Sequence, residues 1–303
     1  MTASTTTSAD PVPAILTTPR HFGLEEIVDL ALQEDIGTGD VTTLATVLAD
    51  RMATGVMLAK QDGVISGIEA ARFVFARVDP SIAFDPLVAD GDRVTNPTPI
   101  VHLAGSARSI LIAERTALNI MQRLSGVATI TAAYVAATAG TKARIVDTRK
   151  TTPGMRMLEK HAVRHGGGHN HRFGLADGVL IKDNHLAAIG GPDRIAKAIA
   201  AARELAPHTL RVEVEVATLD ELDQALSAGA DIVMLDNMST TTMAEAVRRR
   251  DAADPRVLLE ASGGITLGRI PEIAATGVDL ISVGALTHSA GSLDISLDLD
   301  LEG

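Results

Sequence analysis

Residues 210–216 read Leu-Arg-Val-Glu-Val-Glu-Val, a short segment in which charged and apolar side chains alternate. Side chains along a β-strand point alternately to its two faces, so the three valines share one face and Arg211, Glu213 and Glu215 share the other. We expect the valines to pack on covering helices and the charges to face the lumen of a barrel. The alternative is an edge strand with one face in water.

Further short apolar segments occur on both sides of this one. They cover residues 143–147, 178–182, 231–235, 257–260 and 279–283. Helical patterns lie between them, at residues 155–165, 193–205, 219–228, 242–250 and 270–275. Short strands that alternate with helices predict an α/β fold with a parallel sheet covered on both faces. About six strands suit an open doubly wound sheet or an incomplete TIM-like α/β barrel, and the alternating segment favours the barrel.

The N-terminal half has a different pattern, which is typical of a small α+β domain. Short apolar runs between turn pairs predict strands, and helices are expected at residues 24–36 and 68–75. A helix over residues 106–124 is expected to end at Gly126, with a second helix over 128–139. We therefore divide the chain into a disordered extension (1–20), an α+β domain with its linking helix (21–127), a barrel domain (128–290) and an acidic C-terminal segment (291–303).

Composition excludes several classes of protein. The 303 residues include no cysteine, which excludes disulfides, thiolate metal sites and cysteine nucleophiles. Aromatic residues make up 2% of the chain and its net charge is -11, so we expect no nucleic-acid partner. A signal-peptide pattern and apolar runs of membrane-spanning length are missing from the sequence, and we therefore expect a cytoplasmic protein without a membrane partner.

Positive charge is concentrated in one part of this acidic chain. Residues 142–182 contain nine Lys or Arg against three acidic residues. Focused positive potential is what a site for a small polyanion needs, whereas a solvated basic helix face is the simpler explanation. His161 and His165, one helical turn apart, also permit a metal site, but the lack of cysteine and the spacing of Glu159 disfavour it.

Polar or glycine residues follow each expected strand. These sequences are Asp147 to Thr152, Lys182 to His185, Glu215, Asp236-Asn237, Ser262-Gly263-Gly264 and Gly284-Ala285. The carboxyl ends of parallel strands meet on one face of a barrel, where the active sites of such enzymes lie. The series therefore predicts an enzyme whose active site is gathered from successive strands.

The residue types at these ends suggest roles. Arg149 can grip a carboxylate through two hydrogen bonds, and Lys150 adds a point charge. Glu215 and Asp236 suit Mg²⁺ held together with phosphates or sugar hydroxyls, and a salt bridge to Lys182 or Arg149 is the alternative.

The glycines suggest a phosphate site. Ser262, Gly263 and Gly264 precede a helix expected to start near Ile265, and Gly284-Ala285 follow the last strand. Such glycines let backbone N–H groups approach an anion, although a pair of tight turns would need them equally.

Several of these motifs together resemble the quinolinate phosphoribosyltransferases, the carboxylating nicotinate-nucleotide pyrophosphorylases. The resemblance is carried by Thr148-Arg149-Lys150-Thr151-Thr152-Pro153-Gly154, by Gly166-Gly167-Gly168-His169-Asn170-His171-Arg172, by Leu180-Ile181-Lys182-Asp183-Asn184-His185 and by Glu260-Ala261-Ser262-Gly263-Gly264-Ile265. It spans about residues 22–290 and leaves out the first 20 residues and the acidic segment.

The resemblance implies an N-terminal open sandwich, an incomplete barrel and a homodimer with a shared active site. It also implies an Mg²⁺-dependent reaction of quinolinate with phosphoribosyl pyrophosphate that yields nicotinate mononucleotide, pyrophosphate and CO₂. By motif, the quinolinate ligands would be Arg149, His171, Arg172 and Lys182, with Lys150 near both substrates and Arg115 supplied by the partner subunit. Glu215 and Asp236 would serve the ribose and Mg²⁺, and the 5′-phosphate would lie on Ser262, Gly263, Gly264, Gly284 and Ala285.

Two other functions are compatible with the residues alone. A lysine that ends a barrel strand suits imine chemistry, so Lys182 permits a Schiff-base aldolase on a phosphate-binding barrel. A non-catalytic phosphosugar-binding protein would need the glycine loops but neither Glu215 nor Asp236.

Overall fold

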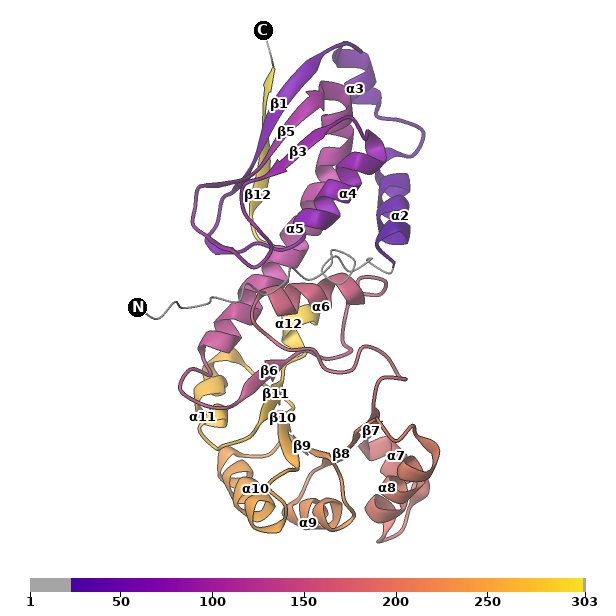
Figure 1. Cartoon of the computed structure of the whole chain (residues 1–303), viewed down its shortest axis with the longest axis vertical. Helices are drawn as coiled ribbons and strands as arrows, with labels where there is room; N and C mark the ends of the chain where they lie inside the picture. Colours follow the sequence, from indigo (N-terminus) through magenta and orange to yellow (C-terminus); the bar gives the residue numbers. More distant parts are fainter. Residues whose placement is uncertain (1–22, 302–303) are drawn as a thin grey trace, which may run out of the picture.

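The structure, a computed structural model, describes residues 23–301, and its two larger sheets are joined by one long helix (Figure 1). The extension expected at residues 1–20 lies outside the described residues. Within the described part of the chain, every helix is too short or too polar to cross a membrane.

The first sheet is antiparallel and has the order β12-β1-β5-β3. Its strands are β1 (Met52–Ala59), β3 (Ala83–Pro86), β5 (Thr98–Ser106) and β12 (Ile295–Leu301). The helices of this part are α2 (Leu24–Ile36), α3 (Val41–Thr46), α4 (Ile68–Val78) and the first half of α5 (Ala107–Ala136), and a small ladder joins β2 (Gly63–Val64) to β4 (Arg93–Val94). Side chains of β1 are alternately buried and more exposed, as expected for a sheet with helices on one face.

The acidic C-terminal segment is part of this sheet. β12 pairs antiparallel with β1, from Ala59 opposite Ile295 to Ala53 opposite Leu301. Ile295, Leu297 and Leu299 pack against the core, and serine or aspartate separates them in the sequence. That period of two is typical of a strand, whereas the charge of the segment and the resemblance, which ends at residue 290, give no sign of one.

The expected break in the linking helix is wrong, because α5 runs without interruption through Gly126. A Cβ at Gly126 would lie 1.8 Å from the carbonyl oxygen of Gly291. The glycine is therefore required by the close approach of the returning chain and does not end the helix. Two side chains of α5 hold the returning segment against the helix. Gln122 Nε2 donates to the Ile295 carbonyl and Arg123 Nη1 donates to the Ala290 carbonyl, both at 2.7 Å.

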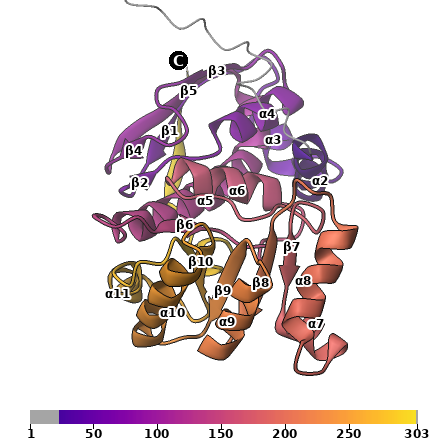
Figure 2. The ribbon, with the colours of Figure 1, turned by 60° about the horizontal axis from the view of Figure 1, so that its bottom comes forward.

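The second sheet confirms the incomplete barrel. Its order is β6-β11-β10-β9-β8-β7 and all its pairs are parallel. The strands are β6 (Arg144–Val146), β7 (Val179–Ile181), β8 (Val212–Val216), β9 (Ile232–Asp236), β10 (Leu258–Ser262) and β11 (Leu280–Ser282). The helices are α6 (Arg156–His165), α7 (Asp183–Ile189), α8 (Arg194–Leu205), α9 (Leu219–Ser227), α10 (Thr240–Ala253), α11 (Ile270–Ala274) and α12 (Ala285–His288). Figure 2 shows α8 to α11 outside the strands and α6 across one end.

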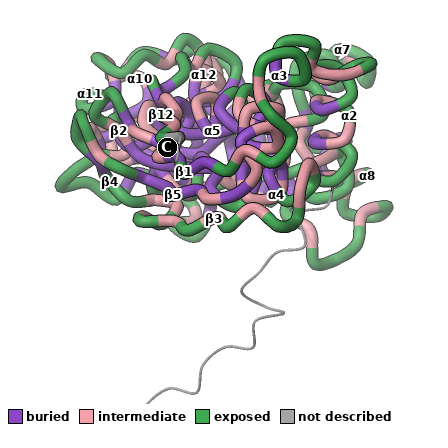
Figure 3. The backbone as a smooth tube through the Cα atoms, turned by 90° about the horizontal axis from the view of Figure 1, so that it is seen from above, coloured by how far each residue is buried: buried purple, intermediate pink, exposed green. Residues whose placement is uncertain are grey.

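The barrel is open between β6 and β7, and one loop narrows the gap. His169 forms a parallel bridge with Val146, donates its backbone N–H to Ile145 at 2.8 Å and accepts that of Asp147 at 3.0 Å. The three valines of β8 are buried and Glu213 is only 4% exposed, so the charged face of this strand lies in the lumen as expected. Figure 3 shows the buried residues gathered around α5 and β1, with exposed residues toward the rim.

Candidate active site

A cavity of about 140 Å³ lies at the carboxyl ends of the parallel strands. We call it the cationic cavity. It brings together six of the residues expected in the site: Arg149, Lys150, His171, Arg172, Lys182 and Ser262. The remaining lining residues are Thr148, Leu180, Met234, Glu260 and Ser282. Four cationic side chains around so small a space form a receptor for a compact anion with more than one charge.

The loop that carries Arg149 and Lys150 is held from α6 by Glu159. This carboxylate is fully buried and accepts from the Thr152 backbone N–H at 3.0 Å and from the Thr152 hydroxyl at 2.8 Å. Arg123 of α5 completes the pairing, with its Nη2 at 2.8 Å from the same carboxylate. The Arg149 Nε is buried without a hydrogen-bond partner among the described residues, so this guanidinium keeps a donor for a ligand.

The loop that carries His171 and Arg172 is held by Asp147 and Lys160. Asp147 is fully buried and accepts from the Asn170 side chain at 2.6 Å and from the His171 backbone N–H at 2.8 Å. Lys160 pairs with Asp147 and donates to the His171 carbonyl at 3.0 Å. Burial lowers the pKa of Lys160, although the Asp147 carboxylate opposes this change.

Like charges face one another in the cationic cavity. Burial and the neighbouring Arg149 guanidinium lower the pKa of Arg172, whose Nη1 donates to the Gly178 carbonyl at 2.9 Å. Like-charged neighbours destabilise each other, and a bound dianion would relieve this repulsion.

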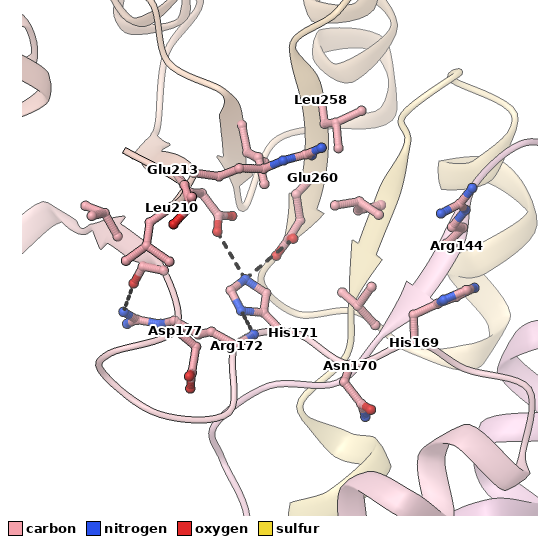
Figure 4. Close-up of a pocket in the computed structure, with 17 residues that line it drawn as sticks. Arg144, His169, Asn170, His171, Arg172, Asp177, Leu210, Glu213, Leu258 and Glu260 are labelled. Carbon is pink, nitrogen blue, oxygen red and sulfur yellow. Dashed lines mark hydrogen bonds and ion pairs between the residues drawn. The ribbon is translucent and has the colours of Figure 1, made fainter. Parts of the chain in front are cut away.

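His171 also reaches down into the lumen, where two glutamates meet it (Figure 4). Its Nε2 lies 3.1 Å from Glu213 Oε2 and 3.8 Å from Glu260 Oε2, while its Nδ1 accepts the Arg172 backbone N–H at 2.8 Å. Burial, and then the charge of Glu213, raises the pKa of Glu260 to about 8. Sequence reasoning missed Glu260, although an acid in the middle of an apolar strand was the signal.

These three side chains have the donor atoms of a metal site, all within 4.8 Å of one another. The hydrogen bonds indicate a proton instead. Since Nδ1 accepts the Arg172 N–H, the ring carries its proton on Nε2, which is the atom that a metal in the lumen would need. His165, from the metal alternative of the sequence analysis, lies elsewhere, with its Nδ1 2.8 Å from the Ser66 hydroxyl.

Glu215 and Asp236 line a second space of about 420 Å³, which we call the carboxylate hollow. Lys182 connects the two spaces, because it lines the cationic cavity and its Nζ lies 2.5 Å from Glu215 Oε2. The salt bridge considered as an alternative is therefore present. Asp236 accepts from the Asn237 side chain at 2.9 Å.

The two glycine loops follow the neighbouring parallel strands β10 and β11. A Cβ on Gly263 would lie 2.3 Å from Asn237 Oδ1, and one on Gly284 would lie 3.1 Å from Lys150 Cδ. Gly263 has φ +89° and Gly264 has φ +58°, so both need glycine for their backbone conformation as well. Ala285 begins the short helix α12 directly after Gly284.

The helix expected near Ile265 starts later. A 3₁₀ turn covers Leu267–Arg269 and α11 follows from Ile270. Pro271 explains the start of α11, because proline favours the first turn of a helix. His288, whose ring lies 3.1 Å from a Cβ built on Gly284, is a neighbour of this loop that sequence reasoning missed.

Arg115 lines neither of these two spaces, and neither do the expected phosphate-binding residues Gly263, Gly264, Gly284 and Ala285. Arg115 is exposed on α5, in the half of that helix that packs beside the first sheet.

Comparison with known proteins gives one consistent result. Residues 40–125 match the family model described as quinolinate phosphoribosyl transferase, N-terminal domain, and residues 127–298 match that of the C-terminal domain. The carboxylating nicotinate-nucleotide pyrophosphorylase of Mycobacterium leprae is 48% identical over 272 residues, which cover 89% of this chain and 94% of that protein. The probable enzyme of the same name from Bacillus subtilis is 43% identical over 93% of this chain and 95% of its own length. The solved structure of the nicotinate-nucleotide pyrophosphorylase from Francisella tularensis aligns with a TM-score of 0.86 at 42% identity, over 93% of this chain and 98% of that one.

Proposed function

Because the chain belongs to the quinolinate phosphoribosyltransferase family, we propose that it transfers the phosphoribosyl group of phosphoribosyl pyrophosphate to quinolinate. The products are nicotinate mononucleotide, pyrophosphate and CO₂. The observation that carries the proposal is the cationic cavity, in which Arg149, Arg172 and Lys182 surround a space for one small dianion.

Quinolinate fits this cavity by charge. Its two adjacent carboxylates pair with Arg149, whose Nε is without a partner in the described chain, and with Arg172. Lys182 and His171 complete the wall, and Lys150 lies toward the second substrate. The buried pairs under both loops hold these cations in place before the ligand arrives, which reduces the ordering cost of binding.

The carboxylate hollow takes the ribose and the metal. Glu215 and Asp236 offer the hard oxygen ligands that Mg²⁺ prefers, and Mg²⁺ bound there with the substrate would neutralise the charge of the departing pyrophosphate. The same carboxylates stabilise the positive charge that develops at the anomeric carbon. The backbone of Ser262, Gly263, Gly264, Gly284 and Ala285 receives the 5′-phosphate.

The ring nitrogen supplies the driving force for loss of CO₂. When it attacks the anomeric carbon, its lone pair becomes the new C–N bond and pyrophosphate leaves with the old bonding pair. The ring is then cationic and stabilises the electron pair that the adjacent carboxylate leaves behind. The chain therefore needs no additional cofactor for decarboxylation.

A homodimer with shared sites accounts for Arg115. This exposed arginine lies outside both spaces of its own chain, so in our proposal it completes the site of the partner subunit. A cytoplasmic location is proposed on the sequence grounds given above.

The test measures pyrophosphate and CO₂ in parallel, with quinolinate and phosphoribosyl pyrophosphate as substrates. We expect both products in equal amounts, and much weaker turnover when nicotinate, which has a single carboxylate, replaces quinolinate. Borohydride trapping of Lys182 with a carbonyl substrate would support the aldolase instead. The contact with Glu215 disfavours it, because the Lys182 Nζ is already engaged by a carboxylate, whereas imine formation needs an amine that is free to attack a carbonyl.

A further inference from the structure

Glu260 lies where the two ends of the barrel meet. It is 1% exposed and lines the cationic cavity from below. It also lines a cavity of about 420 Å³ at the amino ends of the strands, whose wall includes Arg144, Ile232 and Leu258. We call this third space the amino-end cavity, and Figure 4 shows Glu260 in it beside His171 and Glu213.

The surroundings of Glu260 favour its protonated form. The proton that His171 presents to the lumen, on Nε2, is closer to Glu213 than to Glu260. Oε1 of Glu260 is buried without a hydrogen-bond partner among the described residues. A second buried carboxylate beside Glu213 would be costly, and a carboxyl group in that position keeps its proton.

Decarboxylation needs such a proton. When the carbon–carbon bond breaks, CO₂ leaves and the bonding electron pair stays on the ring carbon. That carbon becomes the C–H of the product only after it receives a proton. Arginine does not give up its proton in proteins, Lys182 is paired with Glu215, and the Nε2 proton of His171 faces Glu213. The carboxylic acid of Glu260 is therefore favoured over these groups as the donor.

We propose that Glu260 donates the proton that replaces CO₂ on the ring, and that water in the amino-end cavity restores it. The electron pair on the ring carbon takes the proton of the carboxylic acid, and Glu260 becomes a carboxylate. A proton from solvent then reaches it from the side away from the substrate. This inference rests on the proposed function and adds a catalytic residue to it.

The pH dependence has a definite sign. The groups that face Glu260 are Glu213 from β8, His171 from the loop after α6, Ser282 from β11 and Lys182 after β7. Since the donor must be protonated, the second chemical step slows as pH rises through the pKa of Glu260, which is about 8.

The experiment is a single turnover of full-length enzyme with quinolinate and phosphoribosyl pyrophosphate, quenched and analysed for pyrophosphate and nicotinate mononucleotide. In Glu260→Gln, which keeps the shape of the side chain but has no acidic proton to transfer, we expect pyrophosphate release within about threefold of wild type. Nicotinate mononucleotide formation should slow by about 10²-fold or more, the usual contribution of a general acid. The N-phosphoribosyl dicarboxylate should then accumulate.

Glu213→Gln is the matched variant, because its amide oxygen can still accept from His171. Removal of the like charge lowers the pKa of Glu260, so the alkaline loss of the second step should move to lower pH in this variant. The rate of the second step in the wild-type enzyme, measured as a function of pH, is a test that needs no variant. An increase in this rate between pH 7 and 9 would overturn the proposal.

Two outcomes separate this inference from the proposed function. If the wild-type enzyme releases no pyrophosphate, the proposed function fails and the inference with it. If the wild-type enzyme turns over but Glu260→Gln matches it, or slows both steps equally, the proposed function stands and Glu260 is not the proton donor.

Discussion

The two halves of the candidate active site are supported in different ways. Behind the cationic cavity, two loops are fixed by buried ion pairs from the neighbouring residues Glu159 and Lys160 of α6. In the carboxylate hollow, Glu215 has a single pairing with Lys182, itself 46% exposed, and the adjoining Asp183 and Asn184 are exposed. The comparison indicates a rigid receptor for the pyridine ring beside a more open site that is completed by its ligand.

The largest effect is expected for the rigid half. Arg149→Ala and Lys150→Ala should each reduce kcat/KM by about 10²-fold or more, because each removes a fixed charge that stabilises the bound anions. Neither side chain is part of a hydrophobic core, so Tm should change little. The measurement is steady-state kinetics together with thermal unfolding, and near-wild-type kcat/KM in both variants would exclude this site.

The buried ion pair between Lys160 and Asp147, which lies behind the cationic cavity, can be removed without changing a residue that lines the cavity. Lys160→Met leaves the Asp147 carboxylate buried without its ion-pair partner, which typically costs about 3–5 kcal/mol of unfolding free energy. Denaturant unfolding measures this loss, and the KM for quinolinate should rise because His171 is no longer held through its carbonyl. Lys197→Met, at an exposed position of α8, is the matched control and should leave both unchanged. Equal stability of the two variants would show that the ion pair does not support the loop.

A smaller effect, on the other substrate, is expected in the open half. Asp236→Asn keeps the size of the side chain and removes its charge, so we expect the KM for phosphoribosyl pyrophosphate to rise about tenfold and more Mg²⁺ to be needed. The KM for quinolinate should stay within about twofold. Titration of each substrate at several Mg²⁺ concentrations decides this, and an equal loss for both substrates would contradict the division of the site.

The sequence predicted the strands of the barrel well, since their apolar runs are bounded by the polar residues that build the site. The helix end predicted at Gly126 was wrong because this glycine is required by contact with Gly291, which lies 165 residues later in the chain. A local sequence pattern contains no information about such a contact. Motifs predicted the cations at the strand ends, but not the group beneath them. Glu260 sits inside an apolar run, and its importance depends on Glu213 and His171, which come from other elements.

The smallest return of activity is expected where the rigid half is shared between two chains. Arg115 is exposed and does not line the cationic cavity of its own subunit, and the family resemblance implies that the partner supplies it. If sites are composite, each contains Lys150 from one chain and Arg115 from the other. Mixing inactive Arg115→Ala with inactive Lys150→Ala subunits under exchange then gives heterodimers with one intact and one doubly damaged site.

With random pairing, half of the dimers are mixed and half of their sites are intact, so about a quarter of wild-type activity should return, as two-fold symmetry requires. Each variant mixed with itself is the control and should stay inactive. Mass measurements that confirm subunit exchange, together with activity that remains at the level of the single variants, would mean that Arg115 acts within its own chain. The cationic cavity would then have to recruit this arginine by a movement of α5 or do without it.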